Sequence, residues 1–272
     1  MGEITGRRRA AGKILKSTVY LAVGVLLIGW LLNTPGGLMG KADAIGYAVC
    51  HRIAVRSFFF GERQLPLCAR CSGMYLGAML ALAYQAFLSP RRGGLPRGVV
   101  LGVMIFFVGL FVVDGVNSFL SFFPGAPQLY TPANWLRLLA GTGMGIAIGV
   151  ALYPAFNQTV WAAWDSRPAL PGLRQMGGLL LMAALLDLTM LSNNPLLLYP
   201  LALISAAGVL VLLTMAYGMV WLMFLRLENA YNRISQMIFP LVGGFGFALL
   251  QIALFDLLRF TFTGTWDGFH LG

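Results

Sequence analysis

Charged side chains are scarce in this sequence. Only 10% of its 272 residues are Asp, Glu, Lys or Arg, while 58% are hydrophobic. A water-soluble domain carries about 25% charged residues, so this chain has too little polar surface to cover a soluble globule. Seven separate apolar stretches approach or exceed the roughly 20 residues with which an α-helix crosses a bilayer. The sequence therefore predicts an all-α fold, a polytopic transmembrane helical bundle of about seven spans.

Acidic residues and familiar catalytic motifs are also few. The chain has 9 Asp and Glu against 19 Lys and Arg, a formal net charge of +10. Basic residues in the loops that flank membrane spans explain this excess, and no helix-turn-helix, RNA-binding or basic-zipper pattern supports a nucleic-acid partner. The sequence contains no GxSxG, HExxH or Walker-type loop. No common hydrolase, kinase or dinucleotide-binding class is indicated, and enzymatic activity stays an open question.

The apolar pattern predicts a single membrane domain over residues 1–272. We expect spans near 17–34, 72–89, 98–120, 134–154, 175–193, 199–225 and 236–258. A long Cys- and Arg-rich loop, 35–71, joins the first two spans. The basic start and the apolar run after it resemble a signal peptide. That run is long, and no clean small-x-small cleavage site follows it, so we interpret it as a retained first helix.

The distribution of Lys and Arg predicts the orientation. With the N-terminus inside, twelve of the nineteen cations fall on the inner face, as the positive-inside rule favours. Five of the other seven lie in or just before residues 50–73. An inverted protein is the alternative. We expect a multi-pass protein of the cell membrane, the inner membrane in a prokaryote, with the 35–71 loop on the extracytoplasmic side, where cysteines can oxidise.

All three cysteines and one of the two histidines fall in "CHRIAVRSFFFGERQLPLCARCSG", residues 50–73. Cys50, His51, Cys68 and Cys71 have a CH…CxxC spacing that suits zinc or another thiophilic metal. The same spacing suits a disulfide or reactive dithiol between the last two cysteines, with Cys50 as a resolving thiol. A third interpretation is inert packing, because a free cysteine behaves as a small hydrophobe. The residues alone leave these three interpretations open.

Four arginines accompany the cysteines, namely Arg52, Arg56, Arg63 and Arg70. Guanidinium groups bind phosphate and carboxylate bidentately, so the set predicts an anion- or lipid-binding surface at the membrane edge. For any one arginine, the simpler interpretation is a side chain that extends to water and lipid headgroups without specificity. The set as a whole favours function, because it lies on the face where cations are disfavoured.

Charged residues within the spans form a second group of candidates. Asp114 and Asp187 lie in the third and fifth predicted spans, where a buried charge is costly unless it is paired or functional. Arg137 begins the fourth span, and the short connector should bring it opposite Asp114. These three residues are the candidate catalytic groups, with Asp114 as a proton acceptor. We interpret Asp256 and Arg259, near the end of the last span, as a structural ion pair.

Roughly residues 45–150 resemble a known family. The blocks "CHRIAVRSFFFGERQLPLCARCSGMYLG", "DGVNS" (114–118) and "NWLRLLAG" (134–141) are similar, in the same order, to the prokaryotic membrane family catalogued as domain of unknown function 2085. The resemblance adds weight to nine residues as one set: Cys50, His51, Arg56, Cys68, Arg70, Cys71, Asp114, Asn134 and Arg137. A Pro-Glu pair common in that family is Ala54–Val55 here, which removes a carboxylate. The resemblance implies a membrane protein and no particular reaction.

Three functions are compatible with these observations. The first is an integral membrane protein of unknown activity whose Cys/His/Arg site, at the outer membrane face, binds metal or cycles thiols. The second is a lipid or anion binding or transport protein, although no inverted repeat is evident. The third is an accessory subunit of a larger membrane complex, with other membrane subunits as partners beside the membrane lipids. Zinc or another thiophilic metal is the one cofactor that the residues suggest.

Overall fold

The computed structural model describes the backbone of residues 2–269, and the side chains of residue 12 and of residues 14–269. Within this part, seven helices are long and apolar enough to cross a membrane. They are α1 (Gly2–Asn33), α3 (Ala69–Leu88), α4 (Val99–Leu120), α5 (Asn134–Val160), α6 (Leu173–Leu191), α7 (Pro195–Phe224) and α8 (Ile238–Thr263). The predicted all-α bundle of seven spans is therefore confirmed.

Short elements lie between the spans. Helix α2 (Gly37–Val49), the 3-10 turn η1 (Ala54–Arg56) and an antiparallel hairpin of β1 (Phe59–Phe60) and β2 (Arg63–Gln64) connect α1 to α3. Strand β3 (Arg92–Gly94) pairs in parallel with β4 (Asp165–Pro168), and η2 (Ile234–Met237) precedes α8. The Cys- and Arg-rich connector expected over 35–71 contains regular structure. Its first part folds into α2, which has 13 residues and is too short to span a bilayer.

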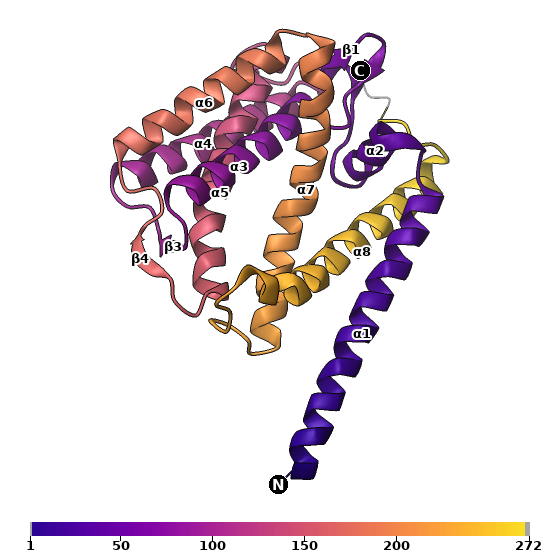
Figure 1. Ribbon diagram of the computed structural model, residues 1–272. Helices are drawn as coiled ribbons and strands as arrows, with labels where there is room; N and C mark the ends of the chain where they lie inside the picture. Colours follow the sequence, from indigo (N-terminus) through magenta and orange to yellow (C-terminus); the bar gives the residue numbers. More distant parts are fainter. Residues whose placement is uncertain (1, 270–272) are drawn as a thin grey trace.

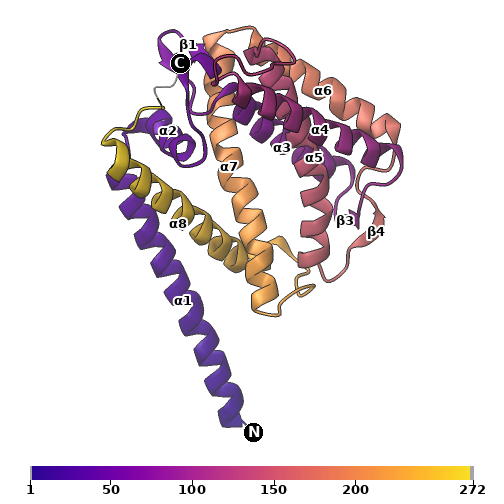
Figure 2. The same ribbon diagram turned by 180° about the vertical axis from the view of Figure 1, so that it is seen from behind.

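The connectors gather at two ends of the bundle (Figure 1). Helix α2, strand β1 and the end of α8 lie at one end, while β3, β4 and the start of α1 lie at the other; Figure 2 shows the same division from behind. We call the first end the cysteine face. It is formed by four segments, 34–68, 121–133, 192–194 and 264–269.

Helices α3 and α5 form the closest pair in the bundle. Glycines on each helix face the backbone of the other, and they are Gly73, Gly77, Gly141, Gly145 and Gly149. A Cβ added at Gly145 would collide with the carbonyl of Met74, and one at Gly141 with the carbonyl of Arg70. Small residues every four positions permit such a close approach of two helices in lipid. The contact fixes the start of α3 against the start of α5.

Helix α1 lies at the edge of the bundle and packs chiefly against α8 (Figures 1 and 2). Large apolar side chains along it are exposed, among them Leu21, Val25, Ile28 and Leu32. Because these apolar side chains are exposed on a spanning helix, they would contact the hydrocarbon chains of the lipids in a bilayer.

Two helix boundaries differ from expectation in ways that matter. Helix α5 continues through Pro154 to Val160 instead of ending near residue 154, because a spanning helix tolerates proline when neighbouring groups satisfy the backbone. Helix α3 begins at Ala69, three residues before the expected 72, with Cys68 as its N-cap. The CxxC motif therefore lies at a helix start.

Candidate cysteine and arginine site

The three cysteines converge at the cysteine face. Cys50 is the C-cap of α2, Cys68 is the N-cap of α3, and Cys71 lies in the first turn of α3. Their sulfur atoms all lie within 4.8 Å of one another, and all three cysteines are free. A tetrahedral ion with metal–sulfur bonds of 2.3 Å holds its sulfurs about 3.8 Å apart. Shifts of about 1 Å or less would thus allow the trio to hold one ion.

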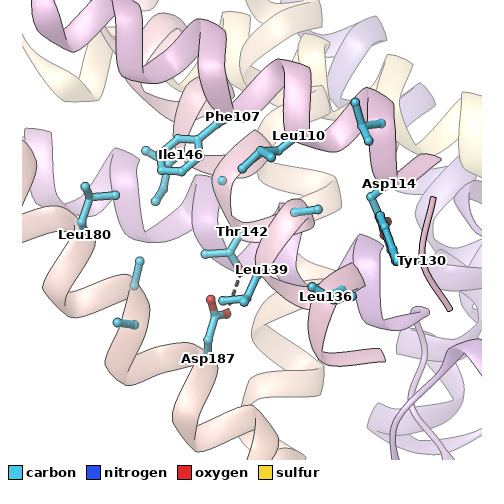
Figure 3. Close-up of a pocket in the computed structure, with 15 residues that line it drawn as sticks. Phe107, Leu110, Asp114, Tyr130, Leu136, Leu139, Thr142, Ile146, Leu180 and Asp187 are labelled. Atoms are coloured by element: carbon cyan, nitrogen blue, oxygen red, sulfur yellow. Dashed lines mark hydrogen bonds between the residues drawn. The ribbon is translucent and has the colours of Figure 1, made fainter. Parts of the chain in front are cut away.

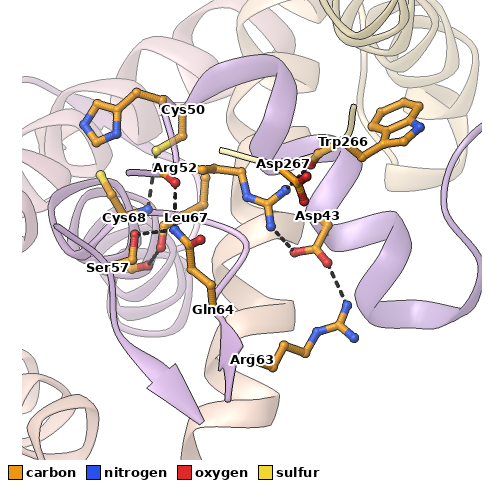
Figure 4. A network of polar contacts seen from close by, with 12 residues as sticks. Asp43, Cys50, Arg52, Ser57, Arg63, Gln64, Leu67, Cys68, Trp266 and Asp267 are labelled. Carbon is orange, nitrogen blue, oxygen red and sulfur yellow. Dashed lines mark hydrogen bonds and ion pairs between the residues drawn. The ribbon is translucent and has the colours of Figure 1, made fainter. Parts of the chain in front are cut away.

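The end of α2 and the start of α3 meet because Gly46 allows it. A Cβ at this position would collide with the carbonyl of Pro66, so the chain that leads into α3 crosses α2 at backbone distance. The Cys50 sulfur then accepts a hydrogen bond from the Cys68 backbone N–H at 3.4 Å (Figure 4). Arg259 of α8 donates to the Cys50 carbonyl at 2.7 Å. Two spans thereby hold Cys50 in place.

The sulfurs share their protons unequally. Hydrogen bonds from the thiols of Cys68 and Cys71 lower the pKa of Cys50 well below its ordinary value, although burial acts in the opposite direction. The hydrogen bond to Cys50 raises the pKa of Cys68 to about 12. The trio therefore favours a thiolate at Cys50, and the thiolate is the form that binds metal and attacks electrophiles.

His51 lies beside Cys50 in sequence but outside the sulfur trio. Its Nδ1 accepts a hydrogen bond from the backbone N–H of Ile53 at 3.2 Å. Burial lowers the pKa of His51, and the charges of Arg56 and Arg70 lower it further, which favours the neutral ring. The structure brings together three of the four predicted metal ligands, and His51 is not among them.

The four predicted anion-binding arginines separate into two groups. Arg52 and Arg63 both bind Asp43 of α2, at 2.9 and 2.6 Å (Figure 4). Arg52 also donates to the carbonyl of Trp266 at 3.1 Å. This network joins α2, the hairpin and the C-terminal segment. Both arginines thus have a carboxylate partner within the loop, and their observed contacts are structural.

Arg70, from the second group, forms a buried ion pair with Asp114 of α4. Its Nε donates to Asp114 Oδ2 at 2.8 Å, and its Nη2 donates to the same oxygen. The hydroxyl of Tyr130 donates to the other carboxylate oxygen at 2.9 Å. Asp114 and Arg137 lie close enough for their charges to interact, as expected, but the ion pair of Asp114 is formed with Arg70 and not with Arg137.

Arg56 and Arg137 have no carboxylate partner in the described part of the chain, and each is at most 7% exposed. Arg56 donates to the carbonyl of Ser118 at 2.8 Å, and its guanidinium lies 3.7 Å from the ring centre of Phe122. Arg137 Nη1 donates to Asn134 Oδ1 at 2.8 Å, while its buried Nε lacks a partner among the described residues.

The second arginine group, Arg56 and Arg70 together with the nearby Arg137, carries excess positive charge close to the cysteines. Burial lowers the pKa of Arg56, and the charges of Arg137 and Arg70 lower it further, while Cys68 and Asp114 oppose the shift. Three arginines, Arg56, Arg70 and Arg137, lie near one carboxylate, that of Asp114, and among the described residues only Arg70 forms an ion pair with it. The surplus of two cations faces thiols, which carry negative charge when they bind a metal.

The remaining acidic candidates lie elsewhere. Asp187 of α6 accepts a hydrogen bond from Thr142 at 2.7 Å and is not part of the sulfur trio. Asp256 accepts from Trp30 Nε1 at 2.9 Å and is not within ion-pair distance of Arg259. The expected Asp256–Arg259 pair is therefore wrong. Arg259 instead satisfies carbonyl oxygens at the end of α2, which have no partner inside that helix.

Sequence reasoning missed Tyr130 and the role of Arg259. Tyr130 lies in an uncharged connector, where nothing in the local sequence indicates a contact with Asp114. Arg259 had one available signal, because the carbonyls that end a helix just before Cys50 need donors. That signal depends on recognising α2, which the hydropathy pattern does not show.

Fold and site together define a polytopic α-helical membrane protein with cysteines and arginines gathered at one end. The model of a family described as "Predicted membrane protein (DUF2085)" matches residues 50–151, a range that begins at Cys50 and includes Arg137. An uncharacterized protein of Methanothermobacter thermautotrophicus is 31% identical over 102 residues, which are 38% of this chain and 82% of the relative. The chain belongs to the DUF2085 family, and the resemblance seen in its motifs is confirmed.

A second relative is less similar, over a slightly longer stretch. An uncharacterized protein of Methanocaldococcus jannaschii is 24% identical over 119 residues, which are 43% of this chain and 70% of the relative. No solved structure matches the chain.

Proposed function

We propose that the protein binds a thiophilic metal ion through Cys50, Cys68 and Cys71, and that zinc suits this site best. The convergence of three free sulfurs within 4.8 Å carries the proposal. Thiolate ligands select zinc, copper(I) or iron–sulfur centres over magnesium and calcium. A disulfide would join two of the sulfurs and leave the third without a partner in a buried position.

Three sulfurs leave one position of a tetrahedral ion for another ligand. Zinc sites with three protein ligands and one exchangeable position are typical of catalysis, whereas structural sites are closed by four. Three thiolates and a divalent ion have a net charge of −1. Arg56, Arg70 and Arg137 together with Asp114 have a net charge of +2. This balance favours an anion, or hydroxide, at the fourth position.

We place the site on the extracytoplasmic face of the membrane. The excess of Lys and Arg in the connectors of the opposite end supports this orientation. On that side, where disulfides form readily, a bound metal would slow oxidation of the thiols, because ligated sulfur is less available for thiol–disulfide exchange.

Metal analysis of the purified protein tests the proposal. Wild-type protein, purified in detergent with a thiol reductant and without chelator, should carry about one equivalent of zinc, as a single three-sulfur site requires. Cys50→Ser, Cys68→Ser and Cys71→Ser should each lose most of it. The matched control is His51→Ala, which should keep the metal, because the His51 ring lies outside the trio. Gel filtration shows whether each variant is folded.

Thiol counting separates the other outcomes. Full alkylation of all three cysteines in native protein that carries no metal after zinc has been offered would overturn the proposal. A mass lower by two hydrogens in protein purified without reductant would show a disulfide and favour the thiol-redox function instead. Loss of metal in His51→Ala, as complete as in the serine variants, would overturn the three-sulfur site in favour of four protein ligands.

A further inference from the structure

An apolar cavity of about 640 Å³ lies between α4, α5 and α6 (Figure 3). Its walls are mostly hydrocarbon, with side chains such as those of Phe107, Leu110, Leu139 and Ile146. Leu110 and Leu139 are also exposed on the outside of the bundle. Because both belong to spanning helices, the cavity is accessible from the hydrocarbon region of the membrane. Mostly apolar walls with a few polar groups that orient a ligand are typical of small-molecule sites.

Asp187 is the polar group of this cavity that lacks a charged partner. Its side chain extends from α6 toward Thr142 of α5, and its Oδ1 accepts a hydrogen bond from the Thr142 hydroxyl at 2.7 Å (Figure 3). Among the described residues Thr142 is its one hydrogen-bond partner, and none of their Lys, Arg or His side chains lies within ion-pair distance. A charge inside a membrane protein is costly unless it is paired. The Asp187 carboxylate therefore needs a proton or a cation.

The other polar groups of the cavity do not supply that cation. Asp114 also lines the cavity, but Arg70, which lies outside the lining, already balances its charge. The Tyr130 hydroxyl donates to Asp114 at 2.9 Å. In the described part of the chain, neither arginine nor lysine lines the cavity. When Asp187 is ionised, the lining and Arg70 together carry one uncompensated negative charge, which a ligand with a single positive charge would balance.

We propose that this cavity binds an amphiphilic amine, a molecule with an apolar body and one protonated amino group that pairs with Asp187. The hydrocarbon walls match the apolar body. An ammonium N–H donates to a carboxylate in a charge-assisted hydrogen bond, which is stronger than a hydrogen bond between neutral groups. The inference goes beyond the metal site and does not depend on it.

Other occupants match the lining less well. A hydrocarbon or an alcohol would fill the space but would leave the Asp187 charge unbalanced. An aminophospholipid would bring a phosphate toward the two carboxylates, and the lining offers it neither arginine nor lysine in the described part of the chain. An inorganic cation would exchange its water for walls that offer too few oxygen ligands.

Binding of tritiated dodecylamine to the protein in phosphatidylcholine nanodiscs tests the inference. Empty nanodiscs measure the amine that dissolves in the bilayer, and the difference gives the saturable binding. We expect one saturable site per protein chain. Dodecanol has the same chain without the amino group, and it should displace the label about 10-fold less well than unlabelled dodecylamine, because it forms no charged hydrogen bond. Equal displacement by the two compounds would overturn the inference.

A matched pair of variants tests the location. Asp187→Asn keeps the shape of the side chain and removes its charge, so it should weaken dodecylamine binding about 10-fold or more. Asp165→Asn is the control, because Asp165 lies on β4, is partly exposed and does not line the cavity. It should bind as wild type does. Both variants should keep the metal content of wild type, which separates this test from that of the proposed function. Equal binding by the two variants would overturn the inference.

Photolabelling of wild-type protein keeps the inference testable if Asp187→Asn fails to fold. Dodecylamine with a diazirine in its chain should label peptides of α5 and α6 that contain Leu139 and Leu180. An excess of unlabelled dodecylamine should suppress this labelling. Labelling confined to α1 and α8, or labelling of α5 and α6 that the excess amine does not reduce, would contradict a site in this cavity.

Discussion

Arg70 and Asp114 tie α3 to α4 through a charge pair buried in the bundle. The Asp114 side chain is 4% exposed and that of Arg70 is 17% exposed. Burial of two charges costs solvation energy that only their mutual attraction and further hydrogen bonds offset. Removal of one partner therefore leaves the other as an uncompensated charge, which is worse than removal of both.

This reasoning predicts a non-additive mutant cycle. Arg70→Met should destabilise the protein by about 3 kcal/mol or more, and the double variant with Asp114→Leu should recover a large part of that loss. Unfolding in detergent, followed by circular dichroism, measures both. The control is Arg92→Met, because Arg92 lies 3.6 Å from Asp165 in a partly exposed pair and should cost less than about 1 kcal/mol. Equal effects of the two arginine substitutions would contradict a buried pair.

Individual site residues could be named from sequence, but their partners could not. The spacing of Cys50, Cys68 and Cys71 indicated one group because the motif is local and unusual. Nothing local indicated that the Ile53 backbone N–H donates to the His51 ring. Side-chain partners depend on which helices are neighbours and on how far each helix is shifted along its axis relative to its neighbour. The hydropathy of the sequence gives neither.

At the scale of elements, the close contact of α3 with α5 determines the geometry of the site. The two helices are not consecutive in the chain, and glycines on both faces let their backbones approach. The start of α3 carries two of the cysteines and Arg70, and the start of α5 carries Arg137. A change in this contact should therefore disturb both the sulfur trio and the arginine group.

A pair of glycine substitutions tests that dependence. Gly145→Ala places a Cβ against the carbonyl of Met74 and should cost about 1–3 kcal/mol, as overpacking generally does. It should also lower metal retention. Gly109→Ala on α4 has no atom within 4 Å of the new Cβ, so it should leave stability unchanged or raise it by up to about 1 kcal/mol. Thermal unfolding and zinc content measure both effects, and indistinguishable variants would refute the role of the contact.

Helix α2 shows what sequence patterns miss at this scale. Its 13 residues are too few for a span, and seven of them are buried by the surrounding structure. Glycine and alanine form much of its packed surface, so few large apolar residues mark it in the sequence. The spanning helices were predictable since each needs only a long apolar run, whereas a short helix is defined by its tertiary contacts.

On the scale of the whole molecule, the seven spans place the connector segments at two opposite ends, and the cysteine face is one of them. The number of spans could be predicted from composition alone, because the bilayer imposes one length on every helix. The arrangement of the helices in space could not be predicted, because hydropathy does not distinguish an apolar helix face that contacts lipid from one that contacts another helix. The peripheral position of α1 is one such result.

The orientation of the bundle gives a prediction at this scale. With the N-terminus inside, an alkaline phosphatase fused after Gly272 should be active and a green fluorescent protein at the same position should be dark. The same two reporters fused within 89–98, at the opposite end, serve as controls and should give the reverse result. Fluorescence at Gly272 would place the cysteine face in the reducing cytoplasm, where a stable disulfide is not expected.

The last described residues contact the segment that carries the first cysteine, Cys50. Arg259 donates to the Cys50 carbonyl across 209 positions of sequence, and the Phe269 N–H donates to the His51 carbonyl at 3.0 Å. During synthesis, the cysteines and α3 enter the membrane long before α8 leaves the ribosome. If the protein binds the proposed metal, an ion that arrives early would meet the three cysteines while the Cys50 carbonyl still lacks its bond from Arg259. Metal loading and completion of the site would then be separate events, and a chain that stalls before its last span would expose the three thiols.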